Sequence, residues 1–118
     1  MAAHAGDSNG IIMKPKESDW KKFRNSLGKW RERYLKWKND EIRVMLEDKN
    51  RNETEKFWDI VEFQKDEAKK LHDCLDGNSR SNMTLHMALM KRYKMIWQDD
   101  IDEFSEELQK ILKEFERT

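Results

Sequence analysis

The chain has 118 residues, one cysteine and a formal net charge of zero from 24 basic and 24 acidic residues. This length suits one domain, the balanced charge lacks the positive excess common in nucleic-acid binders, and no apolar run reaches the roughly 20 residues of a membrane span. The lone cysteine, Cys74, excludes an internal disulfide and favours a reducing compartment, so we expect a cytoplasmic or nuclear protein.

Charged residues make up 41% of the chain and hydrophobic residues 36%, a balance that approaches that of disordered proteins. Five Trp, five Phe and two Tyr argue against disorder, because disordered chains are poor in aromatic residues. The apolar residues recur at helical spacing, and no run alternates as a strand would. We therefore predict an all-α fold, with four amphipathic helices in a small, uneven helical bundle.

Residues 1–17 are mostly small and polar and contain the only proline, Pro15. We expect them to form a flexible N-terminal tail, followed by a single helical domain over 18–118. A first helix is predicted over 18–46, with Ser18 as its cap. Large side chains recur along it three or four residues apart, which places them on one stripe that should be buried. These are Trp20, Phe23, Leu27, Trp30, Tyr34 and Trp37.

A second helix is predicted over 54–76. Asn52 and Glu55 have the spacing of a capping box, Thr54 is the alternative cap, and Gly77 is a natural stop. Its predicted buried face consists of Phe57, Ile60, Val61, Gln64, Ala68, Leu71 and Leu75. Trp58 and Phe63 fall off that face. Either this helix is buried on two sides, or these aromatic side chains form an exposed patch of the kind that marks partner surfaces.

Two shorter helices are predicted over 81–97, capped by Ser81, and over 99–116, capped by Asp99. The short connection between them makes them neighbours in space, and the longer first two helices predict an overhanging hairpin. Met83, Met87 and Met90 form a stripe on the third helix. Methionine serves both adaptable binding grooves and irregular cores, and we favour core filling.

Charge is unevenly distributed along the chain. Residues 14–38 hold ten basic and three acidic residues, a local charge of +7, whereas residues 99–118 hold eight acidic and three basic residues, a local charge of −5. One interpretation is a nucleic-acid contact in which basic side chains meet phosphates and Trp37 stacks on a base. Its candidate contacts are Lys21, Arg24, Arg31 and Arg33. The other interpretation, which we favour, is that the aromatic stripe is buried and the basic helix lies beside the acidic last helix.

His72, Cys74 and His86 are the residues most like metal ligands, but neither C-x₂-C nor H-x₃-H spacing occurs, so no metal site is expected. Acidic residues at the start of the last helix are typical of a first turn, where they meet the positive end of the helix dipole. The sequence contains no recognisable nucleophile motif and no Gly-rich phosphate loop, so we expect no enzyme and no cofactor.

These observations predict a non-catalytic helical domain that binds another protein or itself. Its candidate partner surface consists of Trp37, Trp58 and Phe63, because exposed aromatic side chains are enriched in interfaces. A nucleic-acid-binding domain that uses the basic, aromatic-rich first helix is the alternative.

Overall fold

The computed structural model describes residues 14–116, and within them it contains helices and connecting segments but no strand. The helices are α2 (Glu17–Leu46), α3 (Glu53–Leu75), α4 (Met83–Arg92), α5 (Gln98–Ile101) and α6 (Glu106–Glu116). The predicted all-α class is therefore confirmed for this part of the chain. No helix in the same region is both long enough and apolar enough to cross a membrane.

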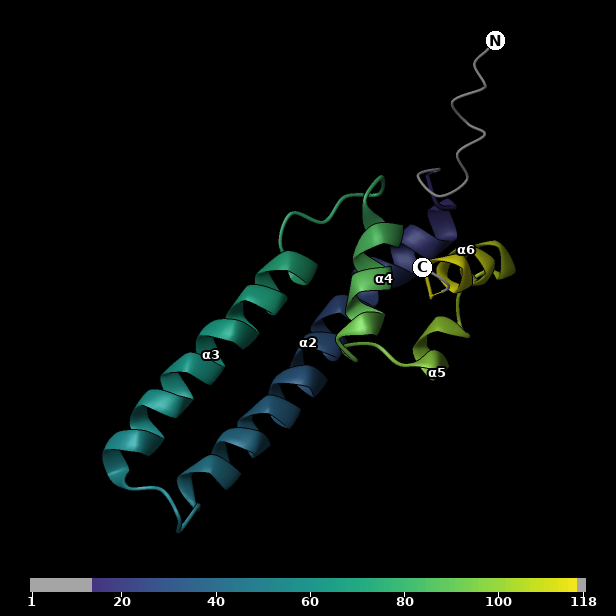
Figure 1. Cartoon of the computed structure of the whole chain (residues 1–118). Helices are drawn as coiled ribbons and strands as arrows, with labels where there is room; N and C mark the ends of the chain where they lie inside the picture. The colour runs from purple at the N-terminus through teal and green to yellow at the C-terminus, as the bar shows by residue number, and fades with distance from the viewer. Residues whose placement is uncertain (1–13, 117–118) are drawn as a thin grey trace.

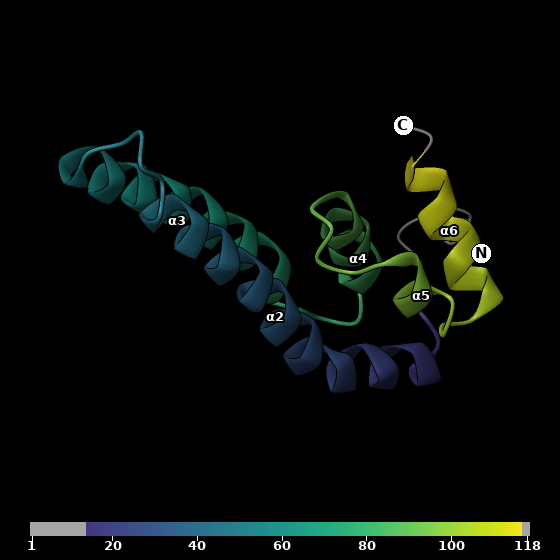
Figure 2. The same ribbon diagram turned by 90° about the horizontal axis from the view of Figure 1, so that it is seen from below.

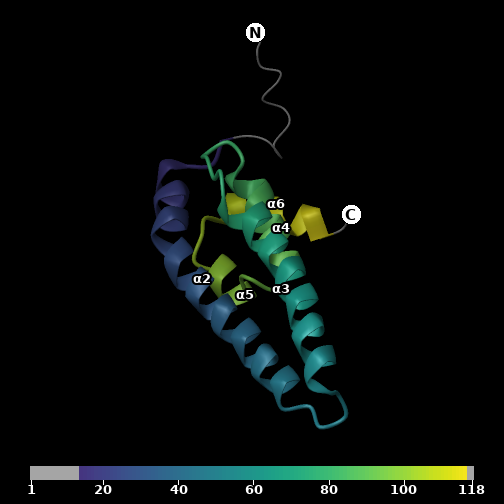
Figure 3. The same cartoon turned by 90° about the vertical axis from the view of Figure 1, so that its left-hand side faces the viewer.

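The molecule is elongated, with extents of 64 × 25 × 23 Å. Helices α2 and α3 form an antiparallel hairpin whose tip projects away from the other helices (Figure 1). Helices α4, α5 and α6 gather at the opposite end, above the N-terminal half of α2 in Figure 2. Figure 3 shows the two long helices closing at the 47–52 connection and diverging towards that end. The hairpin thus overhangs the rest of the fold.

The hydrophobic core lies at the end where all the helices meet. Helix α2 contributes Phe23, Trp30 and Tyr34, all buried. The methionines of the predicted stripe on α4 are fully buried, so core filling is confirmed. The other buried hydrophobic residues are Cys74, Met95, Ile96, Ile101, Phe104, Leu108 and Leu112. Unbranched methionine side chains suit this core, because they fill the irregular gaps between bulky aromatic rings.

Helix α2 begins at Glu17, with Lys16 as its N-cap residue, and Ser18 does not provide the predicted cap. Two residues that the sequence places in the tail contact the fold. The Pro15 carbonyl accepts a hydrogen bond of 2.9 Å from Arg80 Nε, and Lys16 Nζ lies 2.9 Å from Glu107 Oε1. The chain is therefore fixed to the core from at least Pro15 onwards, and residues 1–13 of the predicted tail lie outside the described residues.

The predicted helix over about 81–97 begins one residue later than expected and ends five residues earlier. Asn82, not Ser81, precedes α4, and α4 ends at Arg92 because Lys94 adopts a φ of 62°. The Lys94 N–H donates to the Lys91 carbonyl (3.0 Å), and the Met95 N–H donates to the Met90 carbonyl (2.8 Å). This bonding pattern is a Schellman motif, and buried Met90 and Met95 are in position for its usual apolar contact. Glycine normally occupies this position at the end of a helix, so the lysine in the sequence did not indicate that the helix ends here.

The predicted helix over 99–116 is also wrong, because it is two helices. Asp99 does not cap it; Ser105 Oγ accepts a 3.3 Å hydrogen bond from the Leu108 N–H at the start of α6. Buried Asp19 of α2 accepts hydrogen bonds from the Ser105 N–H (3.0 Å) and hydroxyl (2.5 Å). This tertiary contact holds the break between α5 and α6, since it fixes the residue that caps the second helix.

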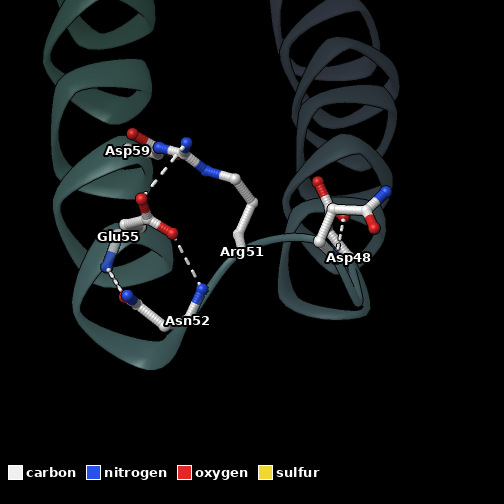
Figure 4. Close-up of polar contacts among 6 residues, drawn as sticks. Asp48, Arg51, Asn52, Glu55 and Asp59 are labelled. Carbon is white, nitrogen blue, oxygen red and sulfur yellow. Dashed lines mark hydrogen bonds and ion pairs between the residues drawn. The ribbon is translucent and has the colours of Figure 1, made fainter.

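The capping box predicted at the start of the second helix is confirmed. The Glu55 N–H donates to Asn52 Oδ1 (2.8 Å), and the Asn52 N–H donates to Glu55 Oε1 (2.9 Å). Figure 4 shows both bonds at the hairpin tip, where Arg51 also reaches Asp59 with Nη2 2.6 Å from Oδ2. The tip therefore owes its order to polar contacts within the 48–59 segment.

Candidate interaction surfaces

Helices α2 and α3 are joined by a buried polar cluster around Glu67. Its carboxylate accepts hydrogen bonds from the Tyr34 hydroxyl and from Lys70 Nζ (3.1 Å), and Lys38 Nζ lies 3.9 Å away. Burial alone would raise the pKa of Glu67, but the hydrogen bonds from Tyr34 and Lys70 outweigh burial and lower it. Burial, followed by the bond to Glu67, raises the pKa of Tyr34. Every member is partnered, so the cluster is a link between helices.

This cluster sets the rotation of α3. Phe63, four residues before Glu67, lies on the same side of the helix and is half-buried. Phe57, Gln64 and Ala68 are exposed, so the predicted buried face is wrong at these three positions. Trp58 is 62% exposed and packs edge-on against Phe57, with ring centroids 5.0 Å apart. Trp58 and Phe63 therefore do not form one surface.

Trp37 lines a groove of about 520 Å³ on the side of α2 that meets the segment following α4. Helix α2 supplies Arg33, Tyr34, Lys36, Trp37 and Asp40, and the segment after α4 supplies Lys94, Met95 and Trp97. Both tryptophans are exposed. We call this the Trp37–Trp97 groove.

Two cation–π contacts hold the tryptophan walls of the groove. The Arg33 guanidinium lies 3.7 Å from the centroid of the Trp97 ring and 2.6 Å from Asp100 Oδ2. Lys38 Nζ lies 3.6 Å from the centroid of the Trp37 ring. Asp100 also accepts a 2.7 Å hydrogen bond from the Trp97 N–H. Each wall is therefore positioned before any ligand arrives, which lowers the entropic cost of binding.

The rim of the groove is positively charged. Lys36 pairs with Asp40 (3.0 Å), and Arg43 shares that carboxylate (2.6 Å). The hydrogen bonds from Arg43 and Lys36 lower the pKa of Asp40, so this acid stays ionised and neutralised by its neighbours. Within residues 14–116 the Lys94 ammonium has no ion-pair partner. An apolar floor beside an unpaired ammonium suits an apolar side chain that is followed or preceded by a carboxylate.

The four candidate nucleic-acid contacts do not lie together. Lys21, Arg24 and Arg31 are exposed and, at spacings of three and seven, share one stripe of α2. Arg33 lies on the other side of the helix, in the groove. Three basic residues of the predicted +7 segment pair with the acidic C-terminal segment: Lys16 with Glu107, Lys22 with Glu103 (3.9 Å) and Arg33 with Asp100.

The residues most like metal ligands have other partners. His72 Nδ1 lies 2.5 Å from Asp76 Oδ2, and His86 Nδ1 lies 2.5 Å from Asn78 Oδ1. Burial raises the pKa of the Cys74 thiol to about 11, so it stays protonated near neutral pH. No group of three or more His, Cys, Asp or Glu side chains within residues 14–116 is arranged to hold a metal ion.

The sequence did not identify Trp97 and Lys94 as groove residues, because the predicted third helix over 81–97 included both of them. The Schellman stop at Lys94 turns the chain and brings Trp97 beside Arg33, and no glycine announces it. Comparison with protein-family models, with curated proteins and with solved structures finds no match for this chain.

Proposed function

We propose that this chain is a non-catalytic helical interaction domain, which binds a segment of another protein in the Trp37–Trp97 groove. The observation that carries the proposal is a groove whose two tryptophan walls are exposed yet held by Arg33 and Lys38. Exposed aromatic side chains on a preorganised apolar surface are the usual anchors of protein interfaces. The lone buried thiol of Cys74 favours a reducing compartment, and we place the domain in the cytoplasm or nucleus.

The rim charge defines the partner segment. Lys94 is free to pair, whereas the charges of Arg33 and Lys36 are already balanced by Asp100 and Asp40. A segment with one large apolar side chain and a nearby Asp or Glu would fill the groove and neutralise that ammonium. A cationic ligand such as a methylated lysine fits less well, because the rim would repel it.

The test selects binders from a random peptide library displayed on phage and measures each binder by calorimetry. We expect peptides that pair an aromatic or large aliphatic residue with an acidic one. Trp37→Ala and Lys94→Glu should each weaken binding by roughly tenfold or more, as hot-spot truncations do. Trp58→Ala and Lys49→Glu, exposed at the hairpin tip away from the groove, are the matched controls. Peptides that bind both groove variants as tightly as the original chain would refute the proposal.

Nucleic-acid binding is the second candidate, and the stripe of Lys21, Arg24 and Arg31 is the observation that favours it. A phosphate-tracking surface loses affinity steeply as salt rises, because each neutralised phosphate releases counterions. A titration of single-stranded and duplex oligonucleotides at several salt concentrations separates the two functions. Tight binding near physiological salt, lost when these three residues and Arg33 become Gln in a folded variant, would favour the nucleic acid.

A further inference from the structure

The α2–α3 hairpin has a second apolar surface, on the side opposite the Trp37–Trp97 groove. Leu35 precedes Trp37 by two residues, which places the two side chains about 200° apart around α2. Leu35 instead lines a hollow of about 380 Å³ with residues of α3, among them Ala68, Leu71 and Leu75. The helices α4 to α6 do not fill this hollow, because none of their residues lines it.

The apolar character of this side continues from the hollow to the hairpin tip. On α2, Ile42 follows Leu35 by seven residues and Leu46 follows by eleven, so both share its stripe. On α3, the same periodicity leads from Leu75 back through Ala68 and Val61 to Phe57. We call this surface the outer face; it consists of Leu35, Ile42, Leu46, Phe57, Val61, Gln64, Ala68, Leu71 and Leu75. Of these, Leu71 and Leu75 are partly buried and also pack against the core.

The outer face carries a projection and a matching hollow. Phe57 is 60% exposed near the tip, and the small side chain of Ala68 lines the end of the hollow that is nearer the tip. A cavity of about 150 Å³ accepts benzene, so the 380 Å³ hollow has room for a phenyl ring. The two features are eleven residues apart along α3, or about 16 Å. A surface that bears both halves of a contact can pair with a copy of itself about a two-fold axis.

A single two-fold axis is compatible with contacts along both helices. If Phe57 of one copy lies over Ala68 of the other, the axis passes midway between these two positions, level with residues 62–63 of α3. The contact between Tyr34 of α2 and Glu67 of α3 fixes the register of the antiparallel hairpin. In this register, residues 62–63 of α3 lie opposite residues 38–39 of α2. That is midway between Leu35 and Ile42, so Leu35 falls over Ile42 of the second copy. This second pairing follows from the hairpin register once Phe57 is placed over Ala68.

Charge and size agree with this pairing. Glu53, one turn before Phe57 on the same stripe, has a side chain that is 91% exposed. Within its own chain Glu53 lies 3.5 Å from Lys56 Nζ. In the second copy it meets the end of the hollow lined by Arg31, His72 and Asp76. His72 and Asp76 pair with each other there, whereas Arg31 has no ion-pair partner within residues 14–116 and is available to Glu53. From Phe57 to Leu75 the face is about 27 Å long and two helices wide, roughly 500 Å² on each copy. The total of about 1,000 Å² is the size at which specific interfaces begin.

We infer that two copies of this chain associate through their outer faces, as an antiparallel four-helix arrangement of two hairpins. This interface lies on the other side of the hairpin from the Trp37–Trp97 groove, so it does not depend on the proposed peptide binding. An interface near this lower size limit is typical of weak, reversible association, so we expect a dimer that dissociates on dilution.

The test is sedimentation equilibrium of the full chain from about 1 to 200 μM, a range chosen to bracket micromolar affinity. Mass is measured directly because a molecule 64 Å long elutes early from gel filtration whatever its oligomeric state. We expect the mass to rise from 14.4 kDa towards twice that value. Phe57→Asp should weaken association by about 100-fold, since it places a charge in the hollow. Val44→Asp is the matched control: Val44 is 67% exposed but lies seven residues after Trp37, on the groove side.

A charge exchange tests the orientation of the two copies. Glu53→Arg should weaken the dimer by about tenfold, and adding Arg31→Glu should restore much of that loss. Circular dichroism checks that each variant is folded, which is expected because every altered side chain is exposed. A wild-type chain that stays monomeric at 200 μM would overturn the inference and leave the outer face to a different protein. A dimer that Phe57→Asp leaves intact would overturn the interface.

Discussion

Asp100 should be the polar residue of the groove region with the largest single effect on stability. Its side chain is 9% exposed and accepts hydrogen bonds from Arg33 Nη2 (2.6 Å), Arg33 Nη1 (3.3 Å) and the Trp97 N–H (2.7 Å). Removing one partner of a buried ion pair costs about 3–5 kcal/mol. The Arg33 side chain is 25% exposed and regains some hydration, so we expect Asp100→Ala to cost about 2–3 kcal/mol.

The assay is urea unfolding followed by far-ultraviolet circular dichroism, with thermal unfolding as a second measurement. For a domain of this size the expected fall in Tm is about 8–12 °C. Asp102→Ala is the control, since Asp102 is exposed and its side chain bonds only locally, to Gln98 Nε2 at 2.8 Å. A cost below about 0.5 kcal/mol for Asp100→Ala would refute the reasoning, because surface substitutions already reach that size.

The same carboxylate makes stability depend on pH. Burial would raise the pKa of Asp100, but the hydrogen bonds from Arg33 and the Trp97 N–H outweigh it and lower the pKa. A lowered folded-state pKa contributes stability above the unfolded value of about 3.9, and that stability is lost as the pH falls through the folded value. Unfolding free energy should therefore decline below about pH 4 in the original chain and decline less in Asp100→Asn.

Three further predictions concern the fold. Trp30→Ala or Leu108→Ala should each cost about 2–5 kcal/mol in urea unfolding, because both side chains are buried; little change would show that the core is misplaced. Lys94→Gly should stabilise the chain by about 0.5–1 kcal/mol, because glycine adopts the positive φ of 62° without strain; a loss of stability would contradict the Schellman assignment. Asn52→Ala should cost about 1 kcal/mol through the capping box, whereas an unchanged urea midpoint would show that the tip frays in solution.

Periodicity predicted the long first helix and the capping box correctly, because both depend on residues close together in the sequence. The stripe from Trp20 to Tyr34 is buried or half-buried as expected, but the prediction is wrong at its last member, because Trp37 is 39% exposed. The break between α5 and α6 could not be predicted with the same means, since Asp19 holds it from a position 86 residues away. The sequence Ser105-Glu106-Glu107 did carry a local signal, a capping residue followed by acids in the first turn.

The rotation of α3 illustrates a different limit. The apolar stripe from Phe57 to Leu75 is real, but the helix turns a neighbouring stripe towards α2, because Glu67 pairs there with Tyr34 and Lys38 of α2. Hydrophobic periodicity finds the apolar face of a helix and says nothing about which element covers it. Of the stripe that sequence reasoning assigned to the core, Phe57, Gln64 and Ala68 are exposed on the outer face, whereas Leu71 and Leu75 pack against the core. Trp37 is the only predicted partner residue that lines the groove.

The two surfaces have a joint consequence if both proposals hold. Pairing through the outer faces covers one side of each hairpin and leaves the Trp37–Trp97 groove on the other side, so the dimer presents two grooves that point away from each other. Two such grooves would bind a partner with two acidic–aromatic segments more tightly than one, provided that its linker spans the dimer. Phe57→Asp should then lower the avidity for a bivalent partner while leaving the affinity for a single peptide unchanged. Trp37→Ala should lower both, so the two measurements separate the contribution of each surface.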